Sequence, residues 1–357
     1  MSIYKELLHI FLKLGFFAYG GPAAHIALMR EEVVEKRHWY SDKEFLTMLS
    51  FTNLIPGPNS TEMALLIGYK KAKFIGLLIA GFSFILPAVS IVIAITAFYV
   101  SYKDIPQIAT IFEGAVPAIF SIILVAVYKL SKSSFKTANT SFIFIICLML
   151  LFFNFSEFTV LALGGILSLY LHFFHSKNKL SSIEPFSLSF LFFSFIKIGS
   201  VLYGSGYVLI SFLRTTFVEN LQWITHQELL DMVVIGEVTP GPVFTTATAI
   251  GYLLNGLSGS FLATVGIFLP SFLFIGIVYP FYEKLLSTTW ITILLEGVNA
   301  ASVAIMFFVA IQLGFSAISG IYSFLFVLVS LFFLTKEKLS PISIMMISSL
   351  IGWFGLF

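Results

Sequence analysis

The tripeptide Pro-Gly-Pro occurs twice in this chain, beginning at residues 56 and 240, and both copies lie inside strongly apolar sequence. The sequence around the two copies matches at nearly the same spacing, so they occupy equivalent positions in two halves of the chain. A helix cannot run undisturbed through two prolines, because each lacks a backbone N–H and its ring clashes with the preceding turn. Helix breaks at matching positions of two apolar halves are typical of the binding site of a membrane transporter.

The composition predicts that the chain lies in a membrane. Hydrophobic residues make up 58% of the chain and charged residues only 11%. A soluble domain of this size could not bury so much apolar surface, so lipid must cover part of it. The one cysteine, Cys147, excludes a disulfide framework and a cysteine-based metal site. The first residues do not have the pattern of a cleaved signal peptide, so we expect none to be removed.

The sequence around the two Pro-Gly-Pro copies also repeats, with a spacing between matching residues that is constant before them and slips by a single position after them. The matching pairs include Lys13 and Lys197, Arg30 and Arg214, Trp39 and Trp223, Gly68 and Gly251, and Pro87 and Pro270. So many pairs at nearly one spacing indicate an internal duplication. We predict a first membrane repeat at residues 1–176, a cytoplasmic linker at 177–185 and a second membrane repeat at 186–357.

Long apolar stretches predict about ten transmembrane helices, since each needs roughly 20 residues to cross the hydrocarbon core. They are 3–29 (interrupted at Gly20-Gly21-Pro22), 74–100, 106–128, 140–154, 158–174, 186–213, 256–282, 290–313, 318–334 and 341–357. Residues 44–69 and 228–252 are divided by Pro-Gly-Pro and are predicted as re-entrant hairpins that face protein or water. The predicted fold class is an all-α polytopic membrane protein.

Five crossings in each half would invert the second half relative to the first, and the basic residues agree with this prediction. Lysine and arginine flank the first Pro-Gly-Pro segment, whereas their counterparts around the second are nearly all neutral or acidic, apart from Arg214. Cytoplasmic loops carry an excess of Lys and Arg, which places the first hairpin inside, the second hairpin outside and both termini outside. Inverted repeats allow alternating access through motion of one part against the other.

The residues that follow each break form the predicted anion site. A half-helix that begins there exposes unpaired N–H groups and the positive end of its dipole. Polar side chains at these two ends are Asn59, Ser60, Thr61, Thr245, Thr246 and Thr248. The helix-breaking residues themselves are Gly20, Gly21, Pro56, Gly57, Pro58, Pro240, Gly241 and Pro242. The alternative is that the polar residues only cap a short helix.

Basic residues inside the apolar segments are candidates for the positive field of an anion pathway, because charged groups there are costly and usually face a cavity. They are Lys13, Lys197, Arg30 and Arg214. The alternative is that these side chains extend to the lipid headgroups.

Three further polar residues are candidates for the site. Glu62 and Glu237 lie beside the two breaks and have no acidic residue at the matching position of the other half. Each either carries a proton during transport or pairs with Lys13 or Lys197. Asn299, in a run of small residues, either joins two helices or belongs to the site.

Several strings of residues resemble the chromate ion transporter (CHR) family in its duplicated, two-domain form. They are Phe17-Ala18-Tyr19-Gly20-Gly21-Pro22-Ala23-Ala24-His25-Ile26 with Arg30, Pro56-Gly57-Pro58-Asn59 with Gly68-Tyr69, and Thr239-Pro240-Gly241-Pro242-Val243-Phe244-Thr245-Thr246-Ala247-Thr248 with Gly251-Tyr252. The resemblance covers essentially the whole chain. It implies a bacterial inner-membrane protein that exports chromate with the energy of the membrane gradient and confers resistance. The charge of Glu62 would repel such a dianion unless this glutamate is protonated or paired.

Other functions stay open or are disfavoured. A carrier of sulfate or another inorganic anion, or a passive anion channel, could use the same helix ends. An enzyme is not expected, because the sequence has no His-Glu-x-x-His motif and its six histidines are scattered. No nucleotide-binding glycine loop is present, and we expect no cofactor, no bound metal and no nucleic-acid partner. The expected partners are a small oxyanion and the lipid bilayer, and a homodimer is an open alternative to a monomer.

Overall fold

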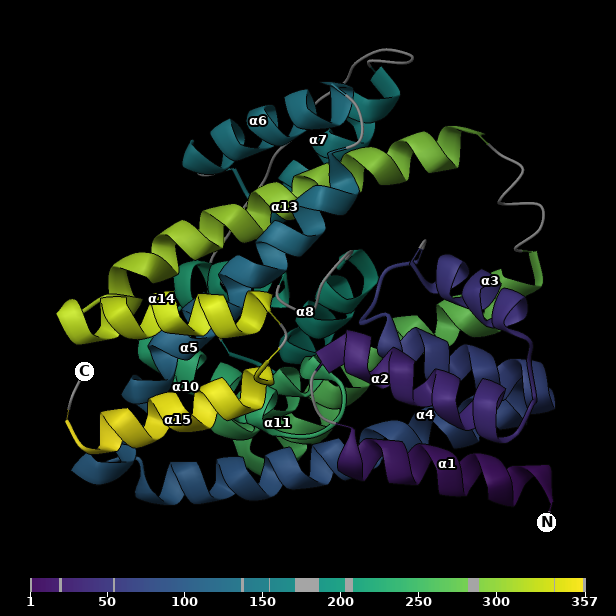
Figure 1. The fold of residues 1–357 in the computed structure, drawn as a ribbon, viewed down its shortest axis with the longest axis horizontal. Coiled ribbons are helices and arrows are strands. Elements are labelled where there is room, and N and C mark those ends of the chain that lie inside the picture. The colour runs from purple at the N-terminus through teal and green to yellow at the C-terminus, as the bar shows by residue number, and fades with distance from the viewer. Residues whose placement is uncertain are drawn as a thin grey trace. The chain divides into compact units, whose positions relative to one another are not determined.

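The computed structural model describes residues 2–18, 21–53, 55–135, 138–153, 155–170, 186–202, 208–281, 289–336 and 338–355 (Figure 1). These residues form helices joined by turns, which confirms the all-α prediction for the described chain. Four helical segments are long and apolar enough to cross a membrane, namely Ser60–Tyr102, Pro106–Lys132, Val243–Val278 and Ile293–Phe315. Five further apolar helices are shorter. The total of about ten crossings stays a prediction, and Gly20 and the linker at 177–185 lie outside the described residues.

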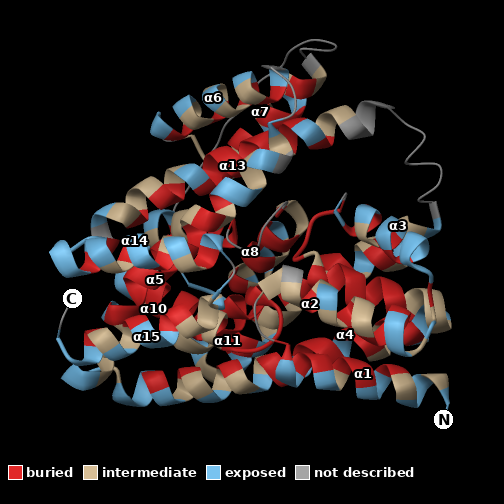
Figure 2. Cartoon of the chain, viewed as in Figure 1, coloured by how far each residue is buried: buried red, intermediate tan, exposed pale blue. Residues whose placement is uncertain are grey.

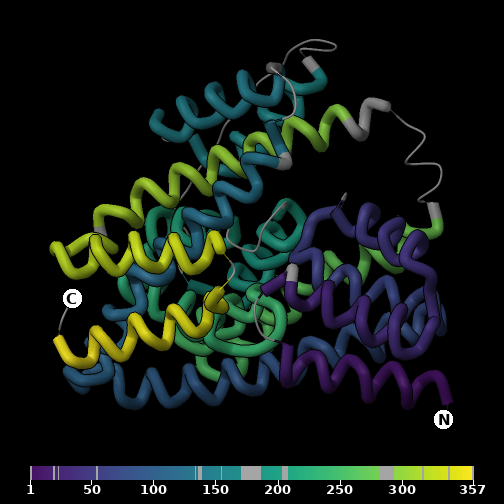
Figure 3. Tube along the Cα trace, in the orientation of Figure 1, coloured from purple at the N-terminus to yellow at the C-terminus, as the bar shows by residue number. Residues whose placement is uncertain are grey.

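The helices gather into two compact units, and each unit takes segments from both halves of the sequence. Unit 1 comprises Met1–Ser101, Phe186–Gly206 and Ile235–Glu283, and unit 2 comprises Tyr102–Pro185, Tyr207–Val234 and Lys284–Phe357. Both Pro-Gly-Pro turns belong to unit 1. The spatial units therefore cut across the predicted repeats, and the course of the chain through them can be followed in Figure 3.

Unit 1 begins with two short helices that meet at the glycine-rich break. Helix α1 (Ile3–Phe17) ends before it, and α2 (Gly21–Arg30) begins at Gly21, whose φ of +73° suits glycine. A π-helical turn at Glu31–Lys36 leads to α3 (Asp42–Thr52). Ser41 caps α3, since its hydroxyl accepts from the Glu44 N–H while its own N–H donates to the Glu44 carboxylate.

Two long helices of unit 1 reverse direction at matching places. Helix α4 (Ser60–Tyr102) turns at Ala72 and Lys73, with φ values of −146° and 53°, and α11 (Thr246–Leu273) turns at Asn255 and Gly256, with φ values of −155° and 54°. The same backbone turn thus recurs at the matching position of the second half. Each turn separates a predicted hairpin from the predicted span that follows it.

Glycines let the two limbs of each reversed helix lie in direct backbone contact. A Cβ atom on Gly68 would lie 2.3 Å from the Gly76 carbonyl oxygen, and one on Gly251 would lie 2.3 Å from that of Gly259. Such close approach is typical of small residues at helix interfaces in membranes. Unit 1 is completed by α8 (Leu188–Val201), the end of α10 (His226–Val238), a 3₁₀ turn at Val243–Thr245, a π turn at Phe274–Val278 and a 3₁₀ turn at Tyr279–Phe281.

Unit 2 is a separate bundle of helices. Its elements are α5 (Pro106–Ser134), α6 (Ala138–Phe152), α7 (Glu157–Tyr170), α9 (Val208–Leu213), a π turn at Arg214–Asn220, the start of α10, α13 (Thr289–Ala317), α14 (Ile321–Thr335) and α15 (Pro341–Trp353). Helices α7 and α13 also approach through glycines, since a Cβ atom on Gly297 would lie 2.1 Å from the Gly164 carbonyl oxygen.

Many large apolar side chains lie on the surface of both units, as lipid contact requires. In Figure 2 the same helices carry buried and exposed faces. Phe11, Phe45 and Phe84 are fully buried in unit 1, whereas Phe82 and Phe261 are more than half exposed. Exposed aromatic residues at this density would be unusual for a soluble monomer. The described structure is that of a membrane protein.

Candidate functional site

Each Pro-Gly-Pro turn is fastened to a helix from the other half of the sequence. The Gly57 N–H donates to the Leu202 carbonyl at 2.8 Å, and the Gly241 N–H donates to the Ala18 carbonyl at 3.1 Å. Leu202 ends α8 and Ala18 ends α1, at matching positions of the two halves. The four residues therefore form a reciprocal pair of hydrogen bonds, and both turns lie within unit 1.

The central glycine of each turn is required by its backbone and by its neighbours. Gly57 and Gly241 have φ values of +138° and +98°, which residues with a side chain rarely adopt. A Cβ atom on Gly57 would lie 1.8 Å from Oε1 of Glu62, and one on Gly241 would lie 2.6 Å from Cβ of Ala88. The Glu62 carboxylate is thus packed into the first turn.

Glu62 is fully buried, and only one of its two carboxylate oxygens has a hydrogen-bond partner among the described residues. Its Oε1 accepts a hydrogen bond from the Ser271 hydroxyl, which α11 supplies from the other half of the chain. Its Oε2 has no partner among the described residues. The predicted alternative of a pair with Lys13 does not fit this structure, because Lys13 binds Glu32.

The polar residues after the first turn differ in what they bind. The Ser60 hydroxyl donates to the Pro58 carbonyl at 3.0 Å, and the Asn59 amide N–H donates to Asn53. Oδ1 of Asn59 and the hydroxyl of the fully buried Thr61 have no partner in the described chain. Two polar groups at the start of this half-helix are therefore available to a ligand.

The hydroxyls after the second turn are occupied. Thr245 donates to the Pro242 carbonyl and Thr246 to the Val243 carbonyl, both at 2.9 Å. Thr248 shares a hydrogen bond of 2.7 Å with Thr264. In this state these threonines hold the short helical turn through its carbonyls, and the Thr245 side chain makes no N-cap hydrogen bond to α11.

Five of the six buried side-chain polar atoms that lack a partner within the described residues lie in unit 1 near these turns. They are Nδ1 of His25, Oδ1 of Asn59, Oγ1 of Thr61, Oε2 of Glu62 and Oε1 of Glu237. A buried polar group without a hydrogen bond costs about 1–3 kcal/mol, so a cluster of them indicates a place that water, a proton or a ligand completes.

Sequence reasoning singled out four of these residues by their place beside the turns but did not assign His25 or Ser271 to the site. His25 is 1% exposed, and its Nε2 lies 3.0 Å from the Ala18 carbonyl, which also accepts from Gly241. The available signal was its position shortly after the Gly21 break. Ser271 lies 209 residues from Glu62, and nothing local connects them.

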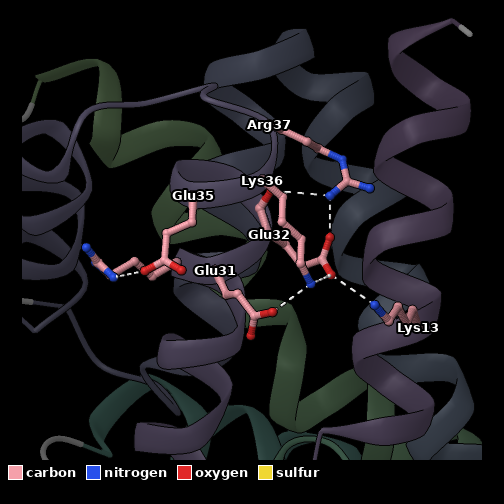
Figure 4. A network of polar contacts seen from close by, with 7 residues as sticks. Lys13, Glu31, Glu32, Glu35, Lys36 and Arg37 are labelled. Atoms are coloured by element: carbon pink, nitrogen blue, oxygen red, sulfur yellow. Dashed lines mark hydrogen bonds and ion pairs between the residues drawn. The ribbon is translucent and has the colours of Figure 1, made fainter.

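The basic candidates are mostly engaged elsewhere. Lys13 is half exposed and binds the buried carboxylate of Glu32 at 2.9 Å, together with Lys36 and Arg37 (Figure 4). Burial opposes a charge on Glu32, but hydrogen bonds from these three cations outweigh it and lower the pKa of the Glu32 carboxyl to about 2.

Arginine residues 30 and 214 take the same kind of partner in the two halves. Arg30 binds Glu35 and Asp42, and Arg214 binds Glu219 and Gln312. Arg30 is exposed in unit 1, whereas Arg214 lies in unit 2. Lys197 is exposed on α8, and Asn299 is half-buried on α13 of unit 2. Within unit 1, the groups that meet at the turns are polar and acidic rather than basic.

The described residues contain no group of three or more His, Cys, Asp or Glu side chains that could hold a metal ion.

Comparisons with known proteins find related sequences along nearly the whole chain. The family model described as "Chromate transporter" matches residues 5–169 and again residues 190–353. A probable chromate transport protein of Synechococcus elongatus is 29% identical over 374 aligned residues, covering 98% of this chain and 94% of that protein. The chromate transport protein of Cupriavidus metallidurans is 29% identical over 98% of this chain and 92% of its own length.

A shorter relative matches only part of the chain. The uncharacterized transporter YwrA of Bacillus subtilis is 30% identical over 135 aligned residues, which cover 36% of this chain and 76% of that protein. No solved structure matches the chain.

Proposed function

Because the chain belongs to the chromate transporter family, we propose that it is a secondary active transporter that exports chromate and so confers chromate resistance. The proposed location is the bacterial inner membrane. The observation that carries the proposal is the cluster of buried, unpartnered polar atoms around two turns that the halves hold reciprocally.

The proposed substrate site lies at the start of the two half-helices. Backbone N–H groups and the helix dipole would attract the anion, and Asn59 and Thr61 would orient it through the polar atoms that now lack partners among the described residues. The threonines after the second turn would contribute once substrate replaces their carbonyl partners. Lys13, Lys197 and Arg30 of unit 1 would act at a distance, by making the approach to the site more positive.

Glu62 and Glu237 are the proposed proton carriers. A dianion beside an ionised Glu62 would be repelled, so Glu62 binds a proton when the anion is bound. The membrane potential supplies about 2.3 kcal/mol per charge at 100 mV. A dianion that is exported without a coupled ion could therefore be concentrated roughly 2,000-fold on the outer side. If one proton moves with it at equal pH, the net charge falls to one and the limit falls to about 50-fold. The charge moved per anion therefore measures the coupling.

Alternating access between inverted repeats is the proposed mechanism. Support comes from features that recur at nearly constant spacing: the reversals in α4 and α11, the arginine–glutamate pairs and the two crossed hydrogen bonds. A carrier of sulfate or another inorganic anion would use the same geometry. A passive anion channel and a homodimer also stay open.

Chromate counterflow in proteoliposomes containing only this protein tests the proposal. Trans chromate should drive saturable uptake that excess sulfate inhibits, which a passive channel would not support. Asn59→Ala should reduce the exchange at least tenfold, because a group that orients the anion is lost. Ser90→Ala is the matched control, since this serine lies exposed on the same helix α4.

Each outcome separates the alternatives. Exchange that Asn59→Ala leaves unchanged would keep the carrier but place its site elsewhere. Sulfate exchange without chromate exchange would make sulfate the substrate. Chromate flux that shows no counterflow would indicate a channel, and no flux from folded protein would refute chromate as substrate.

A further inference from the structure

Unit 2 contains a cavity of about 390 Å³ that the proposed transport site does not use. Its wall is formed by the connection between α6 and α7, the π turn at Arg214–Asn220 and helix α13. Its polar and charged lining includes Glu157, Ser211, Arg214, Thr215, Glu219 and Gln312. A space of this size holds several waters or a small ligand.

Glu157 is the group in this cavity that lacks an explanation. It lies in the first turn of α7 and is 5% exposed. Its Oε1 accepts from the Ser211 hydroxyl at 2.9 Å and from the Thr215 hydroxyl. Its Oε2 is buried and has no partner among the residues that the structure describes. A buried carboxyl beside a polar cavity in a membrane protein is a functional candidate.

The single hydrogen of the Thr215 hydroxyl cannot be donated to both neighbouring carboxylates at once. The Thr215 hydroxyl contacts Oε1 of Glu157 and also lies 3.2 Å from Oε2 of Glu219. A hydroxyl carries a single hydrogen, so it can donate to only one of two ionised carboxylates. Both contacts become hydrogen bonds if one carboxyl carries a proton and donates it to the hydroxyl oxygen.

The net charge of the cavity lining also favours one protonated carboxyl. The lining has two carboxylates, Glu157 and Glu219, and one guanidinium, that of Arg214, so its net charge is −1 when all three are ionised. Arg214 is already bound to Glu219 at 3.1 Å and to Gln312. His226, at the start of α10, interacts electrostatically with Arg214 and Glu219. One proton on Glu157 neutralises the lining.

We infer that Glu157 is a proton-binding site, which exchanges its proton with solution through Thr215 and Glu219. Oxygen atoms of the three residues lie in hydrogen-bond contact one after another, and the Glu219 side chain is 45% exposed. Uptake adds the proton to Oε1 of Glu157, which then donates to the Thr215 hydroxyl oxygen while that hydroxyl donates to Glu219, and release returns the proton to water by the same path. This site is distinct from the proposed carriers Glu62 and Glu237, and it does not depend on the identity of the transported anion.

Infrared difference spectroscopy on the purified full-length protein, without chromate, tests the inference. Acidification should produce a protonated-carboxyl band that Glu157→Gln abolishes. Glu113→Gln, which removes an exposed carboxylate of α5 in the same unit, should leave the band in place. Thr215→Val should move the titration midpoint of the band by about one pH unit toward higher pH, because it removes a donor to the ionised form.

Two further measurements keep the inference refutable. If Glu157→Gln does not fold, Glu157→Asp should retain a titrating band at a shifted frequency and midpoint. Spectra of folded Glu157→Gln that coincide with those of the unmodified protein would overturn the inference. A band that disappears when Na⁺ replaces choline at constant pH would also overturn it, by showing a metal-cation site in place of a proton site.

Discussion

Replacing Gly57 with alanine should destabilise the protein far more than an ordinary glycine substitution in a turn. The backbone there has φ +138°, a region whose cost for a residue with Cβ is about 1–3 kcal/mol. The new Cβ would also lie 1.8 Å from Oε1 of Glu62, so the carboxylate must leave Ser271. A lost hydrogen bond to a charged group adds about 1.5–3 kcal/mol. We expect a total of about 3–6 kcal/mol.

Two controls separate the backbone cost from the collision. Gly21→Ala also places a side chain at positive φ, +73°, but its Cβ would meet no atom within 4 Å, so only the backbone cost applies. Glu62→Ala removes the obstructing carboxylate. In that background Gly57→Ala should cost only about 1–3 kcal/mol, which leaves a coupling free energy of about 2 kcal/mol between the two positions.

The free energy of unfolding can be measured by circular dichroism during titration with sodium dodecyl sulfate in mixed micelles, and chromate counterflow can be measured alongside. The reasoning fails if Gly57→Ala is no worse than Gly21→Ala. It also fails if the effects of Gly57→Ala and Glu62→Ala simply add, because the collision would then not be the cause.

Three other perturbations probe different parts of the chain. Glu32 has a folded-state pKa of about 2 against 4.5 when unfolded, so its stabilisation is complete above pH 4.5 and is lost as the pH falls toward 2. Because two of its cationic partners are about half exposed, we expect the loss to be only about 1–2 kcal/mol. Glu32→Gln should remove this acid dependence, which unfolding midpoints at several pH values and two salt concentrations will show. Lys73→Gly should raise the free energy of unfolding by about 1 kcal/mol, since this lysine has φ 53°. Gly256→Ala at the matching turn should lower it by a similar amount. Equal unfolding midpoints for the two variants would contradict this. Gly297→Ala should separate α7 from α13, because its Cβ would lie 2.1 Å from the Gly164 carbonyl oxygen. If the helices separate, the temperature at which the buried Cys147 reacts with a thiol dye should fall by several degrees. Unchanged reactivity would count against this packing.

Local structure could be predicted from the sequence because residues close together in the chain determine it. Two prolines around Gly57 must break a helix, and the structure has a turn there between α3 and α4. Apolar runs gave helices close to the expected bounds, such as α13 at Thr289–Ala317 for the predicted 290–313.

Long-range contacts could not be read from the sequence in the same way. The Ser271 bond to Glu62 and the mixing of both halves within each unit depend on how distant segments pack. The role of Lys13 was also missed, since its partner Glu32 lies 19 residues ahead across a helix break. For the same reason the hydroxyls of Thr245 and Thr246 could be located as candidates, but not recognised as bound to backbone carbonyls.

The crossed hydrogen bonds from Gly57 to Leu202 and from Gly241 to Ala18 make each half dependent on the other for a backbone acceptor. Neither half can complete its own turn, so the chain behaves as an obligate heterodimer whose two subunits share one polypeptide. A shorter relative that corresponds to a single half would have to obtain the missing carbonyl from a second protein. Fusion of two such genes would fix their pairing, and afterwards each half could diverge only in ways that its companion tolerates.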